Sequence, residues 1–197
     1  MPGYTDRLTA PHGAVVVCSM SSKNQNVFLI GLMAVGKTTV GRHLAAELDL
    51  EFFDADQVIE ARAGADVAWI FDVEGEQGFR DREVHVIEEL TARKGVVIAT
   101  GGGAVLREEN RRALGERGIV VFLETPIERL VDRTRSDRKR PLLRGGNARA
   151  TLERLMRERG PLYESIADYR FIGDRRSAKA LAKEIAERLR ADGKFDA

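Results

Sequence analysis

A glycine-rich octapeptide near the start of the chain carries the groups that bind a polyphosphate. Residues 31–38, GLMAVGKT, fit the pattern G-x-x-x-x-G-K-[ST], directly after a short apolar run and at the start of a stretch with helical periodicity. Backbone N–H groups in such a loop and at the helix N-terminus point at phosphate oxygens. The alternative, a glycine turn beside a surface lysine, explains neither the complete motif nor its position. We therefore expect this loop to bind the phosphates of a nucleoside triphosphate.

Individual side chains of this loop have predicted tasks. Lys37 offers a mobile cation to the β- and γ-phosphate oxygens and is expected to face solvent, and the Thr38 hydroxyl is expected to ligate Mg²⁺. Ala34 stands where many small-molecule kinases have a third glycine. The loop conformation must therefore accommodate a Cβ at this position, and we expect the conformational cost to be small. The predicted ATP contacts in this segment are Ala34, Val35, Gly36, Lys37, Thr38 and Thr39.

Two aspartates follow the next apolar run. Asp54 and Asp56 come directly after residues 51–53, so both are expected at the carboxyl end of a strand, where open α/β sheets bind ligands. A spacing of two places both side chains on one face of an extended chain. One carboxylate is then able to hold the Mg²⁺ shell through water while the other accepts a hydrogen bond from a substrate hydroxyl. The alternative is that Asp56 only caps a helix at residues 57–63.

Around these residues the chain alternates short apolar runs with amphipathic stretches. The alternation is typical of parallel strands connected by helices, and it predicts an α/β fold. Strands are predicted at residues 27–30, 52–53, 96–99, 119–123 and 169–172. Helices are predicted at residues 37–48, 76–93, 107–114, 127–134, 150–159 and 178–190.

Three segments fall outside this pattern. Residues 1–25 hold prolines, glycines and serines without helical or alternating periodicity, and they are predicted to be a flexible N-terminal extension. Residues 135–148 surround Pro141 with glycine and charge, and they are predicted to be a long mobile loop between two helices. The domain is expected to span residues 26–191, which leaves 192–197 as a C-terminal tail.

Composition and charge narrow the class of protein. A chain of 197 residues with 43% hydrophobic residues fits one globular domain, and a net charge of +1 gives no overall reason to expect nucleic acid or a membrane as partner. Cys18 is the only cysteine, which excludes an intramolecular disulfide and fits a reducing compartment. We recognise no targeting segment, so a cytoplasmic location is expected.

Six motifs occur in the order that is seen in shikimate kinases. They are residues 31–38, Asp54-Ala-Asp56, Glu74-Gly-Glu76-Gln-Gly-Phe79-Arg80, Thr100-Gly-Gly-Gly103, Lys139-Arg140-Pro141-Leu-Leu143 and Arg159-Gly-Pro161-Leu-Tyr163. The resemblance runs from about Asn24 to Arg190, and residues 64–71 look especially like the bacterial enzymes. It implies a fold like that of nucleoside monophosphate kinases, a P-loop three-layer sandwich with a central five-stranded parallel sheet flanked by helices. A substrate-binding segment at about residues 55–83 and a lid at about 135–148 would close over the ligands.

The resemblance also implies roles for single residues. Asp56 matches the residue that binds the 3-hydroxyl of the substrate and helps its proton leave, and Arg140 would reach the transferring phosphate from the lid. With Lys37 these two form the implied catalytic set. The implied substrate contacts are Asp56, Arg80, Gly101, Gly102, Gly103 and Arg159. The implied metal residues are Thr38 and Asp54, and Glu83 matches the acid that orients Arg80. Arg133 and Arg176 match arginines that flank the adenine, and together with Arg140 they are the implied ATP contacts outside the phosphate loop.

Physical reasoning agrees with the implied carboxylate site. The planar fork of arginine suits a carboxylate, and Arg80 and Arg159 come from distant segments, as a converging clamp requires. The alternative for Arg159 is a helix end before Gly160-Pro161, where a cation is favourable without any ligand. Glycines at 101–103 allow close approach to the backbone, although a flexible turn would also explain them. Whether Trp69 lines the pocket or packs in a core stays open.

Positive charge gathers around the predicted lid. Residues 129–159 hold eleven Lys or Arg against four Asp or Glu, which suits a lid that closes on a triphosphate and a carboxylate. A solvated basic face is the alternative for several of these arginines. Nucleic-acid binding is not expected, because the segment lacks interleaved aromatic residues and the rest of the chain is balanced in charge.

The resemblance implies transfer of the γ-phosphoryl group of MgATP to the 3-hydroxyl of shikimate. The products would be shikimate 3-phosphate and ADP, on the route to chorismate and the aromatic amino acids. The partners expected are ATP and shikimate, without nucleic acid or membrane, and the chain is expected to be a monomer. One rival is another P-loop small-molecule kinase, acting on gluconate or a nucleoside monophosphate. A second rival is a nucleotide-dependent switch, which would release no phosphorylated small molecule.

Overall fold

The computed structural model describes residues 25–134, 147–173 and 176–196. The predicted extension up to residue 24, almost all of the predicted lid and Arg140 lie outside the described residues. The elements in chain order are β1 (Val27–Ile30), α1 (Lys37–Leu48), β2 (Glu51–Asp54), α2 (Ala55–Ala63), α3 (Val67–Thr91), β3 (Val96–Ala99), the 3₁₀ turn η2 (Ala104–Leu106), α4 (Glu108–Arg117), β4 (Ile119–Glu124), α5 (Ile127–Thr134), α6 (Ala148–Ile166), β5 (Tyr169–Ile172) and α7 (Ala178–Ala191).

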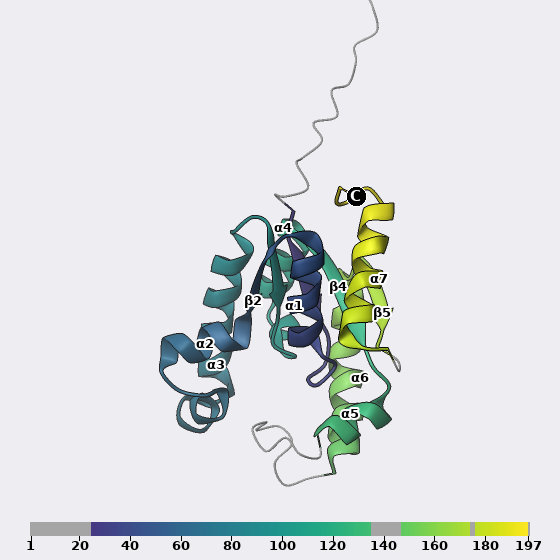
Figure 1. Ribbon diagram of the computed structural model, residues 1–197. Helices are drawn as coiled ribbons and strands as arrows, with labels where there is room; N and C mark the ends of the chain where they lie inside the picture. The colour runs from purple at the N-terminus through teal and green to yellow at the C-terminus, as the bar shows by residue number, and fades with distance from the viewer. Residues whose placement is uncertain (1–24, 135–146, 174–175, 197) are drawn as a thin grey trace, which may run out of the picture.

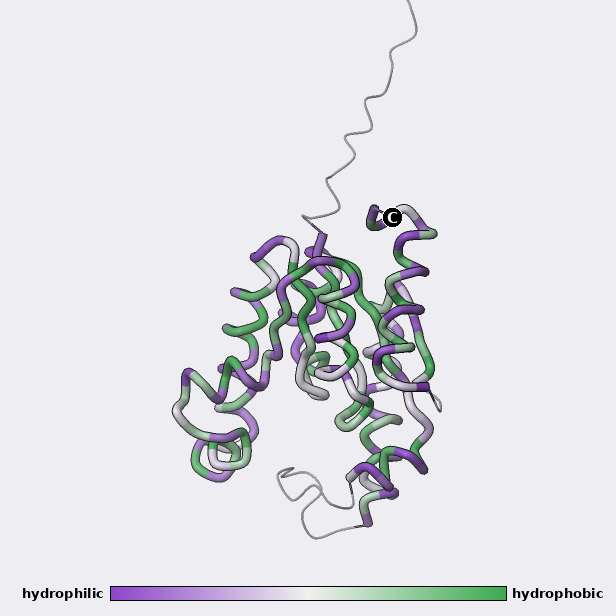
Figure 2. Tube along the Cα trace, viewed as in Figure 1, coloured by the Kyte–Doolittle hydropathy of each residue, from purple (hydrophilic) through white to green (hydrophobic). Residues whose placement is uncertain are grey.

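The five strands form one parallel sheet in the order β2-β3-β1-β4-β5, which confirms the predicted α/β fold. The register places Leu29 of β1 beside Ala99 of β3 and Val121 of β4. The central strands β1 and β3 are buried along their whole length, as expected for apolar runs covered on both faces. Helices α1 and α7 pack together over one face, and α4 and α6 contact β4 from the other (Figure 1). Hydrophobic residues gather in the strands and the inward helix faces (Figure 2).

The carboxyl ends of the strands face one edge of the molecule. In Figure 1 the chain enters β1 from the top, so this edge lies below the sheet, with α2 and part of α3 projecting on one side and α5 with the start of α6 on the other. The chain leaves β1 for β2 and β3 on one side and then crosses to β4 on the other, and ligands of open α/β sheets bind at such a reversal. None of the described helices is both long and apolar enough to cross a membrane.

The helix α3 starts earlier than the sequence pattern predicted. Asp66 caps it by accepting a hydrogen bond from Trp69 N at 2.7 Å, and the helix consists of two halves that meet at Gly75. Gly75 has φ 73° and ψ 177°, a combination of backbone angles that residues other than glycine almost never adopt. Because this break interrupts the helical periodicity, the pattern indicated only the second half.

The predicted end of the helix at Arg159 is wrong. The helix α6 continues through Pro161 to Ile166 and has Asn147 as its N-cap. Proline in a helix removes one backbone hydrogen bond. Beyond it, Tyr163 is fully buried and stacks on Phe122 at 5.1 Å between ring centroids, which favours continuation. Arg159 therefore lies inside a helix, and the helix-end explanation for its charge does not apply.

Candidate active site

The phosphate loop connects β1 to the N-terminus of α1. Gly36 is the N-cap residue at φ 104°, none of the described side chains caps this helix end, and its first turn contains no acid. The free N–H groups and the positive end of the helix dipole are therefore left for an anion. Gly31 has φ 136°, and a Cβ there would fall 2.2 Å from Leu123 O, so close contact with β4 requires glycine.

Lys37 is buried, and the prediction that it faces solvent is wrong. Its Nζ donates hydrogen bonds to Gly31 O and Leu32 O, each at 2.8 Å. The loop curves around the ammonium group, so backbone carbonyls replace water as its hydrogen-bond acceptors. The lysine thereby helps to hold the loop in its curved shape.

Ala34 adopts a left-handed backbone conformation with φ 63°. For a residue with a Cβ this conformation costs about 1–2 kcal/mol. Arg133, on α5, donates from Nη1 to Ala34 O at 3.0 Å and to Val35 O at 3.1 Å, which ties this turn of the loop to a second element. The predicted ATP contact Arg133 is thus adjacent to the phosphate loop.

Asp54, rather than Asp56, caps α2. Its Oδ1 accepts from Gln57 N at 3.3 Å, and its Oδ2 accepts from the Thr38 hydroxyl at 2.6 Å. The alternative that Asp56 serves only as a helix cap is therefore wrong. The two residues predicted to serve a metal ion, Thr38 and Asp54, contact each other directly at the phosphate loop.

Asp56 faces the cavity with an oxygen that has no partner. Its Oδ1 is buried without a hydrogen bond to any described residue. Burial, and then repulsion from Glu83 and Asp54, raise the pKa of Asp56 to about 7, while Lys37 and Arg80 act in the opposite direction. A carboxyl with this pKa is suited to exchange a proton near neutral pH.

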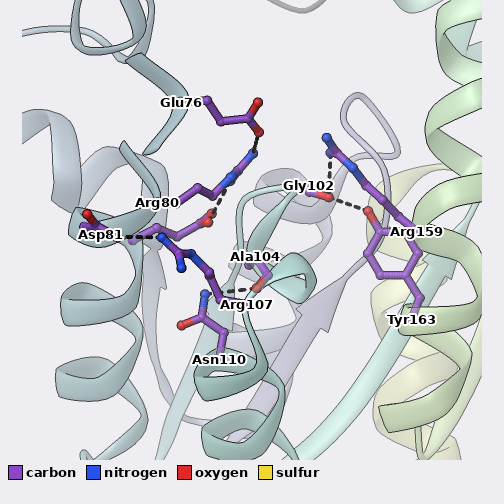
Figure 3. A network of polar contacts seen from close by, with 10 residues as sticks. Glu76, Arg80, Asp81, Gly102, Ala104, Arg107, Asn110, Arg159 and Tyr163 are labelled. Atoms are coloured by element: carbon purple, nitrogen blue, oxygen red, sulfur yellow. Dashed lines mark hydrogen bonds and ion pairs between the residues drawn. The ribbon is translucent and has the colours of Figure 1, made fainter. Parts of the chain in front are cut away.

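Arg80 lies buried among acids and aromatic rings. Its Nη1 donates to Glu83 Oε2 at 2.7 Å, and its Nη2 donates to Glu76 Oε1 at 3.1 Å (Figure 3). The guanidinium also lies 5.3 Å from the centroid of the Phe79 ring. Burial opposes the charge of Arg80, but the charge and hydrogen bond of Glu83, followed by those of Glu76, raise its pKa. Burial raises the pKa of Glu83, against the effect of Arg80. The predicted pairing of Glu83 with Arg80 is present.

Arg159 approaches the glycine segment from the opposite side of the cavity. Its Nη1 donates to Gly102 O at 3.0 Å, and the hydroxyl of Tyr163 donates to the same oxygen at 2.5 Å (Figure 3). Burial also raises the pKa of Tyr163. We assigned no role to Tyr163 or Glu76 from sequence, although both occur in the quoted motifs. The signal for Tyr163 was its position four residues after Arg159, on the same helix face.

The three glycines fit where larger residues would collide. A Cβ on Gly101 would lie 2.5 Å from Glu83 Oε1 and 2.8 Å from Asp56 Oδ1, and one on Gly103 would lie 2.2 Å from Arg80 Nη2. A Cβ on Gly102 would lie 3.0 Å from the backbone nitrogen of Met33 in the phosphate loop. The segment is therefore packed between the phosphate loop and the charged residues, and it is more than a flexible turn.

These groups line a single cavity of about 530 Å³ at the carboxyl edge of the sheet. It is lined by the phosphate loop at Ala34, Gly36, Lys37, Thr38 and Thr39, and by Asp54, Asp56, Phe71, Arg80, Glu83, Gly101, Gly102, Gly103 and Arg159, among others. Within the described residues, five buried side-chain atoms lack a hydrogen-bond partner, and four of them, Asp56 Oδ1, Arg80 Nε, Glu83 Oε1 and Arg159 Nε, belong to residues of this lining. Buried polar atoms without partners are rare, so this concentration indicates a polar ligand.

Four of the described residues that were considered from sequence do not line the cavity, and one of them is Arg133, which contacts the phosphate loop. Val35 is buried beside it. Arg176 lies before α7, where it pairs with Glu184 and donates to Ile172 O at 3.1 Å. Trp69 is 53% exposed and outside the lining, whereas Phe71 is part of it.

No group of three or more His, Cys, Asp or Glu in the part of the chain that the structure describes could hold a metal ion by itself.

Comparison with known proteins agrees with this geometry. A sequence model of the shikimate kinase family matches residues 33–190. The chain is 54% identical over 168 residues to a shikimate kinase of Vibrio parahaemolyticus, which covers 85% of this chain and 98% of that protein. A solved structure of a shikimate kinase from Acinetobacter baumannii in complex with shikimate superimposes with a TM-score of 0.84 at 46% identity, covering 87% of this chain and 96% of that one. A gluconokinase from Sinorhizobium meliloti shares 17% identity at a TM-score of 0.51, which shows a common fold alone. The chain therefore belongs to the shikimate kinase family.

Proposed function

We propose that the chain transfers the γ-phosphoryl group of ATP to the 3-hydroxyl of shikimate, with shikimate 3-phosphate and ADP as products. Membership of the family supports the reaction. The observation that carries it is the joint presence of two buried arginines with unpartnered Nε atoms and the unpartnered carboxyl oxygen of Asp56 in a cavity that adjoins the phosphate loop. One side of the cavity suits an anionic polyphosphate, and the other suits a small hydroxylated carboxylate.

The donor side would hold ATP by its phosphates. Backbone N–H groups at the start of α1 point at the bound oxygens, and Lys37 exchanges its carbonyl partners for phosphate oxygens. Arg133 is positioned by its bonds to the loop. Arg140 and Arg176 remain proposed ATP contacts on the strength of the resemblance.

Thr38 and Asp54 fit the requirements of Mg²⁺. The ion binds few protein ligands, prefers hydroxyl and carboxylate oxygens, and takes its other ligands from phosphates and water. The hydroxyl and the carboxylate are 2.6 Å apart at the phosphate loop, which is consistent with one site served by both. Mg²⁺ bound there would neutralise charge on the phosphate oxygens during transfer.

The acceptor side would orient shikimate for attack. Its carboxylate binds between Arg80 and Arg159, and its ring lies on the segment of Gly101, Gly102 and Gly103. Asp56 accepts the hydrogen bond of the 3-hydroxyl and takes its proton as the phosphoryl group is transferred. Because both arginine side chains are buried, the attraction to the carboxylate is weakly screened by water.

We propose several further features in addition to the reaction. A substrate-binding segment at about residues 55–83 agrees with the projection of α2 and the first half of α3 from the edge of the sheet. A lid at about 135–148, a cytoplasmic location and a monomeric state rest on the composition and on the resemblance, as do the boundaries of the extension and tail.

A coupled assay of ADP release tests the function directly. Wild-type protein is incubated with ATP, Mg²⁺ and, in separate reactions, shikimate, quinate, gluconate or AMP. We expect sustained turnover with shikimate and little with the others. Faster turnover with gluconate or AMP would assign the chain to another substrate, and ADP release without a phosphorylated acceptor would indicate a nucleotide-dependent switch.

A further inference from the structure

Glu76 occupies part of the proposed carboxylate site. Its Oε1 accepts the hydrogen bond from Arg80 Nη2 at 3.1 Å (Figure 3). The side chain of Glu76 is 51% exposed, whereas that of Arg80 is 7% exposed. An acid of the protein thus reaches from the surface to a buried cation and offers it the same chemical group that the substrate carries.

Glu76 takes up part of the only edge of the Arg80 guanidinium that remains open to a ligand among the described residues. Nη1 is taken by Glu83, and Gly103 packs so closely that a Cβ there would lie 2.4 Å from Cζ of Arg80. Nε is buried and has no partner among the described residues. A carboxylate that binds arginine side-on uses Nε together with Nη2. Glu76 therefore holds one of the two donors on the edge that is left for a ligand, and it leaves the other donor unpaired.

The charge of Glu76 also acts on the second arginine of the clamp. Burial lowers the pKa of Arg159, Tyr163 raises it, repulsion from Arg80 lowers it, and Glu76 raises it. Two buried arginines that repel each other are costly without an anion. Glu76 offsets part of this cost, as a bound carboxylate would.

The backbone next to Glu76 is a joint rather than a continuous helix. Gly75 joins the two halves of α3 at φ 73° and ψ 177°, and a Cβ there would meet nothing within 4 Å. Glycine is therefore required by the conformation and not by a lack of space. The half-exposed Glu76 side chain is attached directly after this joint.

We propose that Glu76 is an internal competitor for the carboxylate clamp, which holds Nη2 of Arg80 until the carboxylate of the acceptor replaces it. This inference rests on the proposed function. An acceptor with a carboxylate exchanges one ion pair for another and gains the unpartnered Nε. An acceptor without a carboxylate has nothing with which to displace Glu76, so the contact contributes to selection for acids.

The test compares Glu76→Gln with Glu74→Gln. The first variant keeps the size of the side chain and removes its charge. The second removes a charge two residues away, where Glu74 pairs at 2.8 Å with Arg82 instead of with an arginine of the clamp. The dissociation constant of shikimate is measured by titration calorimetry for wild type and both variants, with the KM of ATP and the melting temperature as further readouts.

We expect Glu76→Gln to bind shikimate about threefold to fivefold more tightly than wild type, the gain from removing one partly exposed ion pair. The KM of ATP should not change, and Glu74→Gln should behave as wild type. A residue that merely supports the fold or orients Arg80 would weaken binding on substitution, so unchanged or weaker binding in a folded Glu76→Gln variant overturns the proposal. Failure of the wild type to phosphorylate shikimate would instead refute the proposed function.

Discussion

Asp56 has the environment of a proton acceptor. Its buried Oδ1 lacks a partner, and its pKa is raised to about 7 by burial and by the neighbouring acids Glu83 and Asp54. Asparagine at this position is able to hydrogen-bond the acceptor hydroxyl but is unable to take its proton. We therefore expect Asp56→Asn to lower kcat by more than it raises the dissociation constant of shikimate. Wild-type kcat in this variant would reduce Asp56 to a positioning residue, and steady-state kinetics with calorimetry separates the two outcomes.

The same shift predicts how stability depends on pH. The folded state holds the Asp56 proton more tightly than the unfolded state, whose pKa is near 3.8, so the free energy of unfolding falls as the pH rises from about 4 to 7. Asp56→Asn removes this loss. At pH 8 we expect the variant to be more stable than wild type by on the order of 2 kcal/mol, with the difference narrowing toward pH 5. Urea unfolding at the two pH values measures it, and a variant less stable than wild type at pH 8 would contradict the assignment.

Ala34 stores conformational strain in the phosphate loop. At φ 63° its Cβ is unfavourable, and glycine would remove that cost while adding freedom to the unfolded chain. We expect Ala34→Gly to stabilise the protein by about 0.5–1 kcal/mol in urea unfolding. The matched control is Ala46→Gly on the exposed face of α1, which should destabilise by about 1 kcal/mol. Equal losses in both variants would mean that the loop does not hold Ala34 in the left-handed conformation.

At the scale of elements, the side chain of Asn26 connects α3, α4 and β3 at the edge of the sheet opposite the cavity. Its Nδ2 donates to Arg93 O at 2.7 Å after α3 and to Arg117 O at 3.2 Å at the end of α4, and its Oδ1 accepts from Val96 N at 3.2 Å in β3. Asn26→Ala would leave these buried backbone groups without partners. We expect a loss of about 2–4 kcal/mol in the free energy of unfolding, with KM values for both substrates unchanged at 25 °C. A selective rise in one KM would show that this end of the sheet contributes to the site.

Element boundaries were predictable where burial alone decides them. The strands β1 and β3 have the predicted bounds, because a short apolar run between turn residues fits a buried strand and little else. The partly exposed edge strand β5 also has its predicted bounds. The first half of α3 was missed, because the break at Gly75 hides its periodicity, and α6 was cut short, because Pro161 ordinarily ends a helix. In both cases tertiary packing overrides the local preference.

The residues of the site were predictable as a set, but their contacts were not. The motif identified Lys37, yet its burial against Gly31 O and Leu32 O depends on how the loop curves in three dimensions. Asp54 and Asp56 were recognised as a pair, but which of them caps α2 depends on the residue at which the extended chain becomes helix, and that residue is Ala55. Tyr163 contacts Gly102 in a distant segment, and spacing does not reveal that contact. Glu76 lies four residues before Arg80 on the same helix, so their pairing was open to prediction from spacing and was missed.

At the scale of the whole molecule, the sheet brings the phosphate loop and the two arginines of the proposed carboxylate clamp to one edge. The helix that carries Arg80 follows β2 and α2, and the helix that carries Arg159 follows β4 and α5, so the two arginines meet only in the folded chain. Gly102 contacts both sides, with Met33 of the phosphate loop at one end and Arg159 and Tyr163 at the other. In the proposed function, this shared segment would set the position of the acceptor relative to the γ-phosphate.

The central claim is that Arg80 and Arg159 bind the carboxylate of the acceptor, and Arg159→Lys tests it most directly. Lysine keeps the charge but loses the planar fork, and hydrogen bonds to a charged group are worth roughly 1.5–3 kcal/mol. We predict that the KM of shikimate rises about tenfold to a hundredfold while the KM of ATP stays nearly constant. A loss confined to ATP, or no loss for either substrate in a folded variant, would contradict the carboxylate clamp.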